Sequence, residues 1–321
     1  MHLDKDNISE SNPLISVIVL SWNHEEFIEE AINSIINQSY ANIEIIYIDN
    51  FSSDKTFELA QQRLNLGGRR YKTKKFDSNI GVPKAVNYAL QNMCTGNFIG
   101  LHSGDDWLIL ENFEKKMRYH QQNPQFKIVY SNGYAYYEDI KSTELLSKDD
   151  YCKEGDIFRD LLKINFLFTQ GILIKKEVYD NIGLYNENCS IEDWDFSLKA
   201  SKKYQIGYLN EPLFYWRRHS KSYSFGMKPD KFYEDVLYII NQYRRYPEHR
   251  LGVKWVAMEH IRKKIGTLNS LESLKYLVKY NYLIIPILRS SSTENALLKC
   301  LWKMGRPFKK LITGRQHYNN D

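Results

Sequence analysis

The sequence lacks the features of a secreted or membrane-spanning protein. Its four cysteines are far apart and show no paired metal-binding spacing, so we expect reduced packing residues rather than a disulfide framework or a zinc site. No stretch approaches the roughly 20 apolar residues that cross a bilayer, and the opening residues, MHLDKDNISE, lack the basic and then apolar run of a signal peptide. From these absences we expect the protein to stay in the cytoplasm.

Glycine is missing where two common nucleotide-binding motifs need it. The apolar run at 15–20 is followed by SWNHEE, which contains no glycine. A dinucleotide fingerprint or a phosphate loop has glycines directly after the first strand, because the backbone there must approach the phosphates closely. The sequence therefore argues against a dehydrogenase and a P-loop enzyme. It also argues against a sugar-nucleotide pyrophosphorylase, in which we expect a Gly-rich loop with Arg and Lys at this place.

Basic residues are slightly outnumbered by acidic ones in the first part of the chain and in excess in the last. Residues 230–321 contain 17 Lys and Arg against 8 Asp and Glu, whereas the preceding residues contain 27 against 31. A basic segment can attract nucleic acid, anionic lipid or a phosphorylated substrate. No nucleic-acid motif is present, so we expect no nucleic-acid partner. The tail at 294–312 could dock on the protein or lie on an anionic membrane, which leaves peripheral association with the inner face of the membrane open.

Short apolar runs alternate with amphipathic stretches through the first hundred residues. The runs at 15–20 and 43–48 are apolar enough for buried strands, and 25–38 between them places its apolar side chains on one helical face. This pattern predicts an α/β fold built from parallel strands and crossover helices. Further expected elements are helices at 56–66, 84–93 and 113–122 and strands at 71–76, 97–102 and 127–131.

The rest of the sequence indicates where the chain divides. A polar stretch at 143–152 is a candidate mobile loop. From residue 230 onward the pattern is helical and has no strand-like runs. We therefore expect an α/β domain at 1–229, with a mainly parallel central sheet flanked by helices, and a basic helical C-terminal region at 230–321.

Polar side chains follow three of the predicted strands, at the edge where an open α/β sheet binds its ligands. Asp105 and Asp106 could hold Mg²⁺ or Mn²⁺ against a nucleotide diphosphate, or form a solvated turn with a helix cap. Asp49 could accept a hydrogen bond from a nucleobase or cap a helix. Ser21 and Asn23 could contact the nucleotide or serve ordinary turn chemistry.

Five segments of the chain resemble, in order, the motifs of the family 2 inverting glycosyltransferases. The resemblance implies a nucleotide-diphospho-sugar-binding fold of the GT-A type, with Asp49 in nucleotide binding. In one departure from the family pattern, Ser103 stands at the first position of its Asp-x-Asp motif, where it could bind the ribose or act through a water. The segments are 16–56, NIGVPKAVNYAL at 79–90, GNFIGLHSGDD at 96–106, GLYNENCSIEDWDFSLKA at 183–200 and YWRRHSKSYS at 215–224.

The same resemblance implies roles for an acidic pair and the residue after it. Asp193 would be the base that takes the proton of an acceptor hydroxyl as it attacks the anomeric carbon directly, with inversion. Glu192 would assist at the substrate, and Trp194 would pack against the sugar ring. Without the resemblance, Glu192 and Asp193 are equally well explained as acidic residues that favour the start of a helix.

A basic cluster near residue 218 would complete the donor site. Arg217 and Arg218 would bind the diphosphate, and a neutral His219 would join Asp105 as a metal ligand, unless the cluster is an ordinary basic surface patch. Lys84 is a further candidate for phosphate binding.

Together these features predict a metal-dependent hexosyltransferase that uses Mg²⁺ or Mn²⁺ and a nucleotide-sugar donor, with a UDP-sugar as the first candidate. The acceptor would be a glycan or a lipid-linked molecule in the assembly of a bacterial surface polysaccharide of the O-antigen or capsule type. Because of Ser103, the alternative is a non-catalytic nucleotide-sugar-binding protein. The enzyme interpretation fails if Asp49, Asp105 and Asp193 point into unrelated regions instead of lining a shared pocket.

Overall fold

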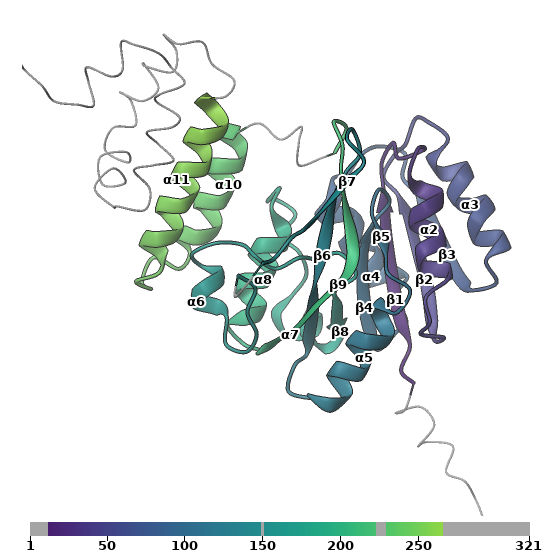
Figure 1. Ribbon diagram of the computed structural model, residues 1–321, viewed down its shortest axis with the longest axis horizontal. Coiled ribbons are helices and arrows are strands. Elements are labelled where there is room, and N and C mark those ends of the chain that lie inside the picture. The colour runs from purple at the N-terminus through teal and green to yellow at the C-terminus, as the bar shows by residue number, and fades with distance from the viewer. Residues whose placement is uncertain (1–11, 149–150, 223–228, 266–321) are drawn as a thin grey trace, which may run out of the picture. The chain divides into compact units, whose positions relative to one another are not determined.

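The computed structural model describes residues 12–148, 151–222 and 229–265 (Figure 1). The chain divides into two compact units, residues 1–226 and residues 227–321. The boundary expected from the sequence lies after residue 229. Three cysteines of the first unit, Cys94, Cys152 and Cys189, are buried thiols, as expected; Cys300 lies outside the described residues.

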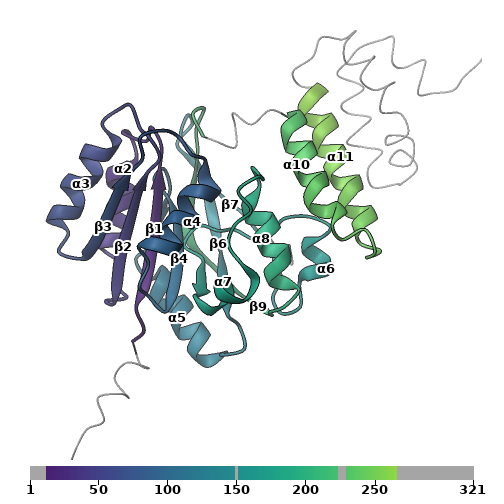
Figure 2. The same cartoon turned by 180° about the vertical axis from the view of Figure 1, so that it is seen from behind.

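The first half of unit 1 is a parallel sheet flanked by helices, as predicted. Its strands follow the order β3-β2-β1-β4, and each adjacent pair is parallel. Helices cover both faces of this half (Figure 2). The elements are β1 (Ile15–Ser21), α2 (Ile28–Ile36), β2 (Ile43–Asp49), α3 (Thr56–Leu66), β3 (Arg70–Lys75), α4 (Val82–Asn92) and β4 (Phe98–Ser103).

Alternation along β1 divides its side chains between the core and the pocket described below. Val17 and Val19 belong to the hydrophobic core together with the apolar face of α2, which includes Ile32. Each such buried side chain contributes about 1.5–3 kcal/mol relative to an exposed one. The intervening residues, among them Ile18, point to the opposite face, where they line a pocket with Val86 of α4. The core therefore holds β1 in place, and β1 forms the floor of the pocket.

The second half of unit 1 is mixed, because antiparallel strands extend the parallel sheet. From β4 the order continues as β8-β6-β9-β5, with β7 paired to β6. Strand β7 occupies the start of the polar stretch at 143–152, so the loop expected there is wrong for residues 143–145. The elements are β5 (Trp107–Leu108), α5 (Asn112–Gln122), β6 (Ile128–Tyr137), β7 (Ser142–Leu145), α6 (Phe158–Leu161), β8 (Leu173–Lys175), α7 (Glu177–Ile182), α8 (Glu192–Ser201) and β9 (Ile206–Arg218).

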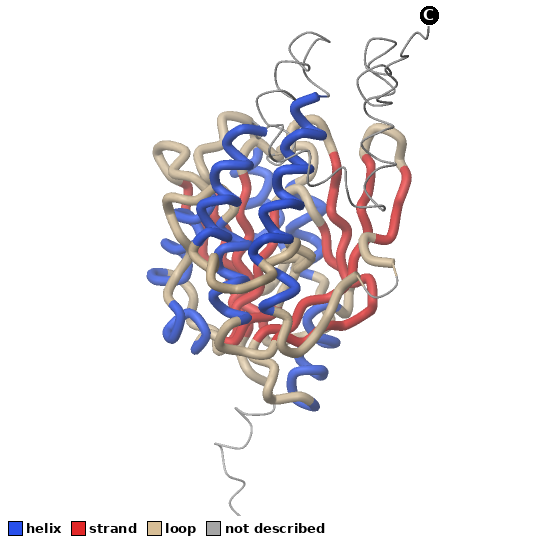
Figure 3. The backbone as a smooth tube through the Cα atoms, turned by 90° about the vertical axis from the view of Figure 1, so that its left-hand side faces the viewer, coloured by secondary structure: helices blue, strands red, loops and turns tan. Residues whose placement is uncertain are grey.

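The described part of unit 2 is a pair of helices, α10 (Pro229–Asn241) and α11 (His249–Ile265), shown in Figure 3. Their contact buries Val236, Ile239 and Val256. The helical pattern expected from residue 230 is thus present up to residue 265, whereas the tail at 294–312 lies outside the described residues. Among the described helices, none combines the length and the apolar character needed to span a bilayer.

Candidate functional site

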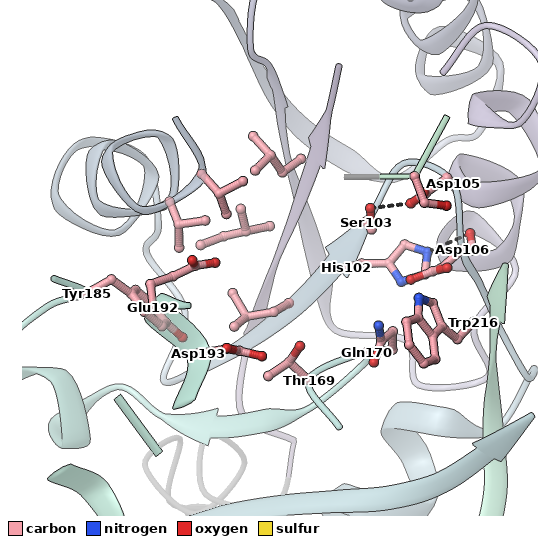
Figure 4. Close-up of a pocket in the computed structure, with 16 residues that line it drawn as sticks. His102, Ser103, Asp105, Asp106, Thr169, Gln170, Tyr185, Glu192, Asp193 and Trp216 are labelled. Carbon is pink, nitrogen blue, oxygen red and sulfur yellow. Dashed lines mark hydrogen bonds between the residues drawn. The ribbon is translucent and has the colours of Figure 1, made fainter. Parts of the chain in front are cut away.

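A pocket of about 300 Å³ opens at the carboxyl ends of β1 and β4 (Figure 4). Asp105 and Asp106 lie on one side of it, and Glu192 and Asp193 lie on the other. Two of the three carboxylates that were expected to share a pocket, Asp105 and Asp193, therefore do so. The lining residues are Ile18, Leu20, Val82, Val86, Leu101, His102, Ser103, Asp105, Asp106, Thr169, Gln170, Tyr185, Glu192, Asp193, Trp216 and Ser222.

Asp105 is a buried carboxylate that the surrounding residues keep ionised. Ser103 Oγ donates to its Oδ1, and His219 Nε2 lies 3.1 Å from its Oδ2. The ring of His24 approaches the same oxygen, with Nε2 at 3.8 Å. Burial alone would raise the pKa of Asp105, but the hydrogen bond from His219, the charge of His24 and the hydrogen bond from Ser103 outweigh it and hold the pKa well below its ordinary value.

Asp106 has a different role from its neighbour. It is almost fully buried, and its Oδ1 accepts a 2.8 Å hydrogen bond from the backbone N–H of Arg217. Burial and the adjacent charge of Asp105 raise its pKa. His102 Nε2 lies 3.0 Å from the backbone oxygen of Asp106, and burial lowers the pKa of His102 to about 4, so this imidazole is neutral at pH 7. Asp106 therefore ties the end of β4 to β9.

Arg217 does not bind diphosphate in this arrangement, which corrects the expectation from the sequence. Its Nε donates to the backbone oxygen of Asp105 over 2.8 Å, and its two terminal nitrogens pair with Glu138 and Glu30. The guanidinium carbon also lies 4.5 Å from the centre of the Trp107 ring. Because every side-chain nitrogen has a protein partner, Arg217 positions the Asp105 loop instead of binding a ligand.

Two other expected phosphate-binding residues lie outside the pocket lining. Lys84 is exposed on the first turn of α4. Arg218 is half-buried and its guanidinium carbon lies 4.2 Å from the ring centre of Trp216, which does line the pocket. Of these two, Arg218 remains the better candidate for binding an anion at the pocket, and its role there stays a prediction.

The residues expected to bind the nucleotide after β1 and β2 are engaged with one another. Asp49 is fully buried; its Oδ1 accepts from the N–H of Ser52 over 2.8 Å, and Ser21 Oγ lies 3.4 Å from its Oδ2. Asn23 accepts a 2.9 Å hydrogen bond from the N–H of Ser53. Asp49 has no exposed surface in this arrangement, and its role in base recognition stays a prediction. Ser21 connects the ends of β1 and β2, and Asn23 connects the loops that follow them, so their nucleotide contacts also stay predictions.

Glu192 and Asp193 begin α8, and both line the pocket. Burial and the neighbouring Asp193 raise the pKa of Glu192 to about 8. Burial also raises the pKa of Asp193, although the N–H of Trp194 donates to its Oδ1 over 2.7 Å and favours the charged form. The side chain of Trp194 is fully buried and donates its indole N–H to the oxygen of Leu161, so the expected contact of Trp194 with a sugar ring is wrong.

Several lining residues had no role assigned from the sequence. Thr169 and Gln170 are placed by Gly171, which has a φ of 59° that favours glycine, and whose oxygen accepts from the buried Lys116 Nζ over 2.7 Å. No motif of the sequence marks this loop. His24, in contrast, lies in SWNHEE directly after the first strand, so its position was a usable signal.

The donor atoms around Asp105 determine which cation this edge of the pocket could hold. Asp105 and His219 offer a carboxylate oxygen and an imidazole nitrogen close together, a pair that suits a divalent cation. The described residues contain no group of three or more His, Cys, Asp or Glu side chains arranged as a metal site. Both imidazoles facing Asp105 have a buried Nδ1 atom with no partner among these residues.

The sequence and the fold are similar to those of known glycosyltransferases. The family described as "Glycosyl transferase family 2" matches residues 16–183. A glycosyltransferase of Haemophilus influenzae is 28% identical over 228 residues, which are 67% of this chain and 68% of that protein. Glycosyltransferase GlyG of Streptococcus pneumoniae is 27% identical over 223 residues, which are 65% of this chain and 72% of that protein.

Two solved structures show the same architecture. Staphylococcus aureus TarS 1–349, in complex with UDP-GlcNAc, superposes with a TM-score of 0.63 and 18% identity, over 93% of this chain and 84% of that chain. The mannosyltransferase PcManGT from Pyrobaculum calidifontis, in complex with GDP-Man and Mn²⁺, superposes with a TM-score of 0.58 and 13% identity, over 95% of this chain and 88% of that chain. The family match over more than half of the chain, together with this architecture, shows that the chain belongs to glycosyl transferase family 2 and has the GT-A fold.

Proposed function

We propose that this protein transfers a sugar from a nucleotide-diphosphate donor to an acceptor hydroxyl, with inversion at the anomeric carbon. The observation that carries the proposal is the pocket itself, in which Asp105 and Asp193 lie on opposite sides. A donor between them would present its diphosphate to the Asp105 side and its sugar to the Asp193 side. Direct attack by the acceptor then needs one base and no covalent intermediate.

Asp193 is the residue we propose as that base. An acceptor hydroxyl is a poor nucleophile, so a carboxylate must take its proton during the attack. Glu192 supports this role because its raised pKa of about 8 keeps it protonated at neutral pH, so that it adds no second negative charge beside Asp193. The N–H of Trp194 donates to Asp193 Oδ1 and so favours the ionised form of Asp193 that this role needs.

Asp105 and His219 would hold the divalent cation, Mg²⁺ or Mn²⁺. A cation bound there would neutralise the charge that develops on the departing diphosphate. Ser103 supports Asp105 by donating to its Oδ1, which compensates in part for the missing first carboxylate of the Asp-x-Asp motif. Arg217 and Asp106 fix the backbone around Asp105, so that the carboxylate faces the pocket.

A UDP-sugar remains the first candidate donor, and the relation to TarS, which was solved with UDP-GlcNAc, supports it. The acceptor we propose is a glycan or a lipid-linked molecule in bacterial surface polysaccharide assembly, a setting that rests on the family resemblance. With such an acceptor, the protein would act in the cytoplasm or at the inner face of the membrane.

A thermal-shift screen of UDP-, GDP- and dTDP-sugars, with and without Mn²⁺, tests the proposal directly. At a ligand concentration of about 100 times Kd, binding stabilises a protein by roughly 2.7 kcal/mol, which raises the Tm of a domain of this size by several degrees. We expect one class of donor to stabilise the protein only when Mn²⁺ is present. The stabilising donor is then incubated with candidate acceptors, and the glycosylated product is detected by mass spectrometry.

The outcomes separate the enzyme from the alternative of a non-catalytic binding protein. Stabilisation by a donor without hydrolysis or transfer, and with Asp193→Asn causing no further change, would favour the binding protein. A panel in which no nucleotide sugar stabilises the chain would contradict both interpretations of the pocket.

A further inference from the structure

Two imidazoles from distant parts of unit 1 approach the same carboxylate oxygen. His219 Nε2 lies 3.1 Å from Asp105 Oδ2, and His24 Nε2 lies 3.8 Å from that atom. The two rings lie edge to face with their centres 6.5 Å apart. His24 follows β1 and His219 follows β9, so the fold brings them together at Asp105. This arrangement gathers two nitrogen donors and one oxygen donor.

Independent contacts hold the backbone of His24 in this position. Its N–H donates to Thr56 Oγ1 over 2.7 Å, and its oxygen accepts from the N–H groups of Phe27 and Ile28 at 2.9 and 2.8 Å. Gly104 allows the Asp105 loop to approach the end of β1 closely, because a Cβ atom there would lie 2.7 Å from the Cβ of Ser21 and 3.0 Å from His24 Nδ1. The hydrogen bonds that fix the backbone of His24 do not involve its imidazole, so the ring is presented to Asp105 independently of them.

The donor separations are close to those of ligands around one cation. Two donors bound to the same divalent ion at about 2.1 Å lie about 3.0 to 3.4 Å apart, depending on the coordination geometry. The pair His219 and Asp105 meets this separation as it stands. His24 Nε2 lies 3.8 Å from Asp105 Oδ2, about 0.4 to 0.8 Å beyond this range. The described residues accordingly contain no three-ligand group arranged as a metal site, and binding of a cation by His24 requires its ring to move toward Asp105.

We propose that His24 is the third protein ligand of the cation, and that it gives the site a preference for Mn²⁺ over Mg²⁺. The proposal rests on the proposed function, which requires a cation at Asp105. Mg²⁺ favours an all-oxygen environment and keeps most of its waters, whereas imidazole nitrogen suits transition metals. Two imidazoles and one carboxylate therefore favour Mn²⁺. His24 would also replace the donor that is lost because Ser103 stands in the Asp-x-Asp motif.

A purely positioning role for His24 makes a different prediction from a ligand role. If His24 only orients Asp105, its removal weakens Mn²⁺ and Mg²⁺ binding by the same factor. If it binds the metal, its removal weakens Mn²⁺ binding more than Mg²⁺ binding, because the nitrogen donor contributes little to Mg²⁺ affinity. The ratio of the two affinities therefore distinguishes the roles without any measurement of transfer.

The experiment measures binding of Mn²⁺ to the full chain in the presence of UDP, with free Mn²⁺ followed by electron paramagnetic resonance and Mg²⁺ added as competitor. The variants are His24→Ala and His24→Gln, with Asp105→Asn as a variant of the shared ligand. His249→Ala is the matched control, since this histidine lies on α11 and contacts Asn241. Tm values confirm that each variant is folded, and His24→Gln keeps most of the side-chain volume if His24→Ala is destabilised.

We expect the wild-type chain to prefer Mn²⁺, His24→Ala to weaken Mn²⁺ binding by about tenfold or more with a smaller loss for Mg²⁺, and His249→Ala to change neither. Equal losses for the two metals, or unchanged Mn²⁺ binding, would overturn the assignment of His24 while leaving the cation at Asp105 in place. If the wild-type chain binds no Mn²⁺, the assignment also fails, and transfer in the presence of a chelator then decides whether the proposed function survives without metal.

Discussion

At the scale of single residues, two carboxyl groups at the start of α8 share one pocket and cannot both be charged without cost. Burial raises the pKa of each, and the neighbouring charge raises that of Glu192 further, to about 8. The hydrogen bond from the N–H of Trp194 favours ionisation of Asp193. Protonation of Glu192 and this hydrogen bond both favour the ionised form of Asp193 that the proposed base needs.

For the proposed base we expect Asp193→Asn to lower kcat by about 10² to 10⁴, because an amide cannot accept the proton of the acceptor hydroxyl. Donor binding should change little, since the substitution preserves the size of the side chain. Initial rates and donor Kd values measured on the same preparation check both parts. Asp180→Asn on α7, where Asp180 is exposed, is the control. A variant that keeps wild-type kcat would remove Asp193 from the mechanism.

The pH dependence of stability tests the placement of the Glu192 proton. The pKa of Glu192 rises from its ordinary value of 4.5 to about 8 on folding, so the unfolded chain binds fewer protons than the folded chain between these values. Wild-type stability therefore falls as the pH rises through this range. The Glu192→Gln side chain cannot ionise. We therefore expect the Tm of this variant minus that of the wild type to increase between pH 5 and pH 8, and to stay constant at higher pH. Thermal unfolding at each pH measures the difference.

Glu177→Gln on α7 is the matched control for this series, since Glu177 is a half-exposed acid that pairs with lysines. Its Tm difference from the wild type should not grow with pH. A Glu192→Gln difference that stays flat from pH 5 to pH 8 would show that Glu192 ionises normally, and would remove its role in keeping the charge on Asp193.

At the scale of elements, the end of β9 is fixed to the Asp105 loop through Arg217. The guanidinium is enclosed between Phe27 and Trp107, at 4.6 and 4.5 Å from their ring centres, and its Nε binds the backbone oxygen of Asp105. Since β9 also runs parallel to β6 over most of its length, this contact connects the pocket edge to the sheet. Arg217 thus serves the site through the position of an element.

We expect Arg217→Ala to lower the free energy of unfolding by about 2–4 kcal/mol, since it leaves a cavity and an unpaired backbone oxygen. It should also weaken Mn²⁺ binding, because Asp105 loses its support. Arg217→Lys should rescue neither property, since an ammonium cannot make the forked contacts.

Denaturant unfolding and metal titration measure the two effects. Arg63→Ala, which breaks a half-exposed pair with Glu29, is the control and should cost less than 1 kcal/mol. Equal effects of the two alanine variants would contradict the role of Arg217.

The elements also show why the sequence predicted one half of the fold better than the other. Strands β1, β2 and β4 are buried by helices on both faces, so their apolar runs are unmistakable. Strand β9 alternates buried and exposed residues irregularly and pairs with β6 through register shifts. These register shifts leave no simple periodicity in the sequence of β9. Strands β7 and β8 have only 4 and 3 residues, too few to show a periodic pattern.

Part of the site could be predicted from the sequence, because the ligand-binding residues of an open α/β sheet come directly after its strands. Ser103, Asp105 and Asp106 were expected at the ligand-binding edge, and all three line the pocket. Glu192 and Asp193, which also line it, were expected there from the family resemblance. The sequence does not indicate which polar side chains bind other groups of the protein instead of a ligand, because these contacts depend on the tertiary structure. Asp49, Trp194 and Arg217 are held by contacts with Ser21, Leu161 and Asp105, which lie tens of residues away in the sequence.

At the scale of the whole molecule, charge is divided unevenly along the chain. Residues 230–321 carry 17 Lys and Arg against 8 Asp and Glu, whereas the residues before them carry a small excess of acid. An anionic membrane surface does not attract the acidic first part of the chain. It attracts a basic segment with a binding free energy of about 1 kcal/mol for each basic residue that lies near the surface. If the acceptor is lipid-linked, the C-terminal region would bring the enzyme to the surface where that acceptor lies.

We therefore expect the full chain to sediment with vesicles containing anionic phospholipid, but not with vesicles of neutral phosphatidylcholine. Replacing Lys309 and Lys310 with Gln, in the segment outside the described residues, should weaken binding by roughly thirtyfold, which corresponds to about 2 kcal/mol. Replacement of the exposed Lys55 and Lys84 in unit 1 is the matched control and should have little effect. Raising the salt concentration should release the protein, because the attraction is screened. Equal binding to neutral and anionic vesicles would show that charge is not what brings the chain to a membrane.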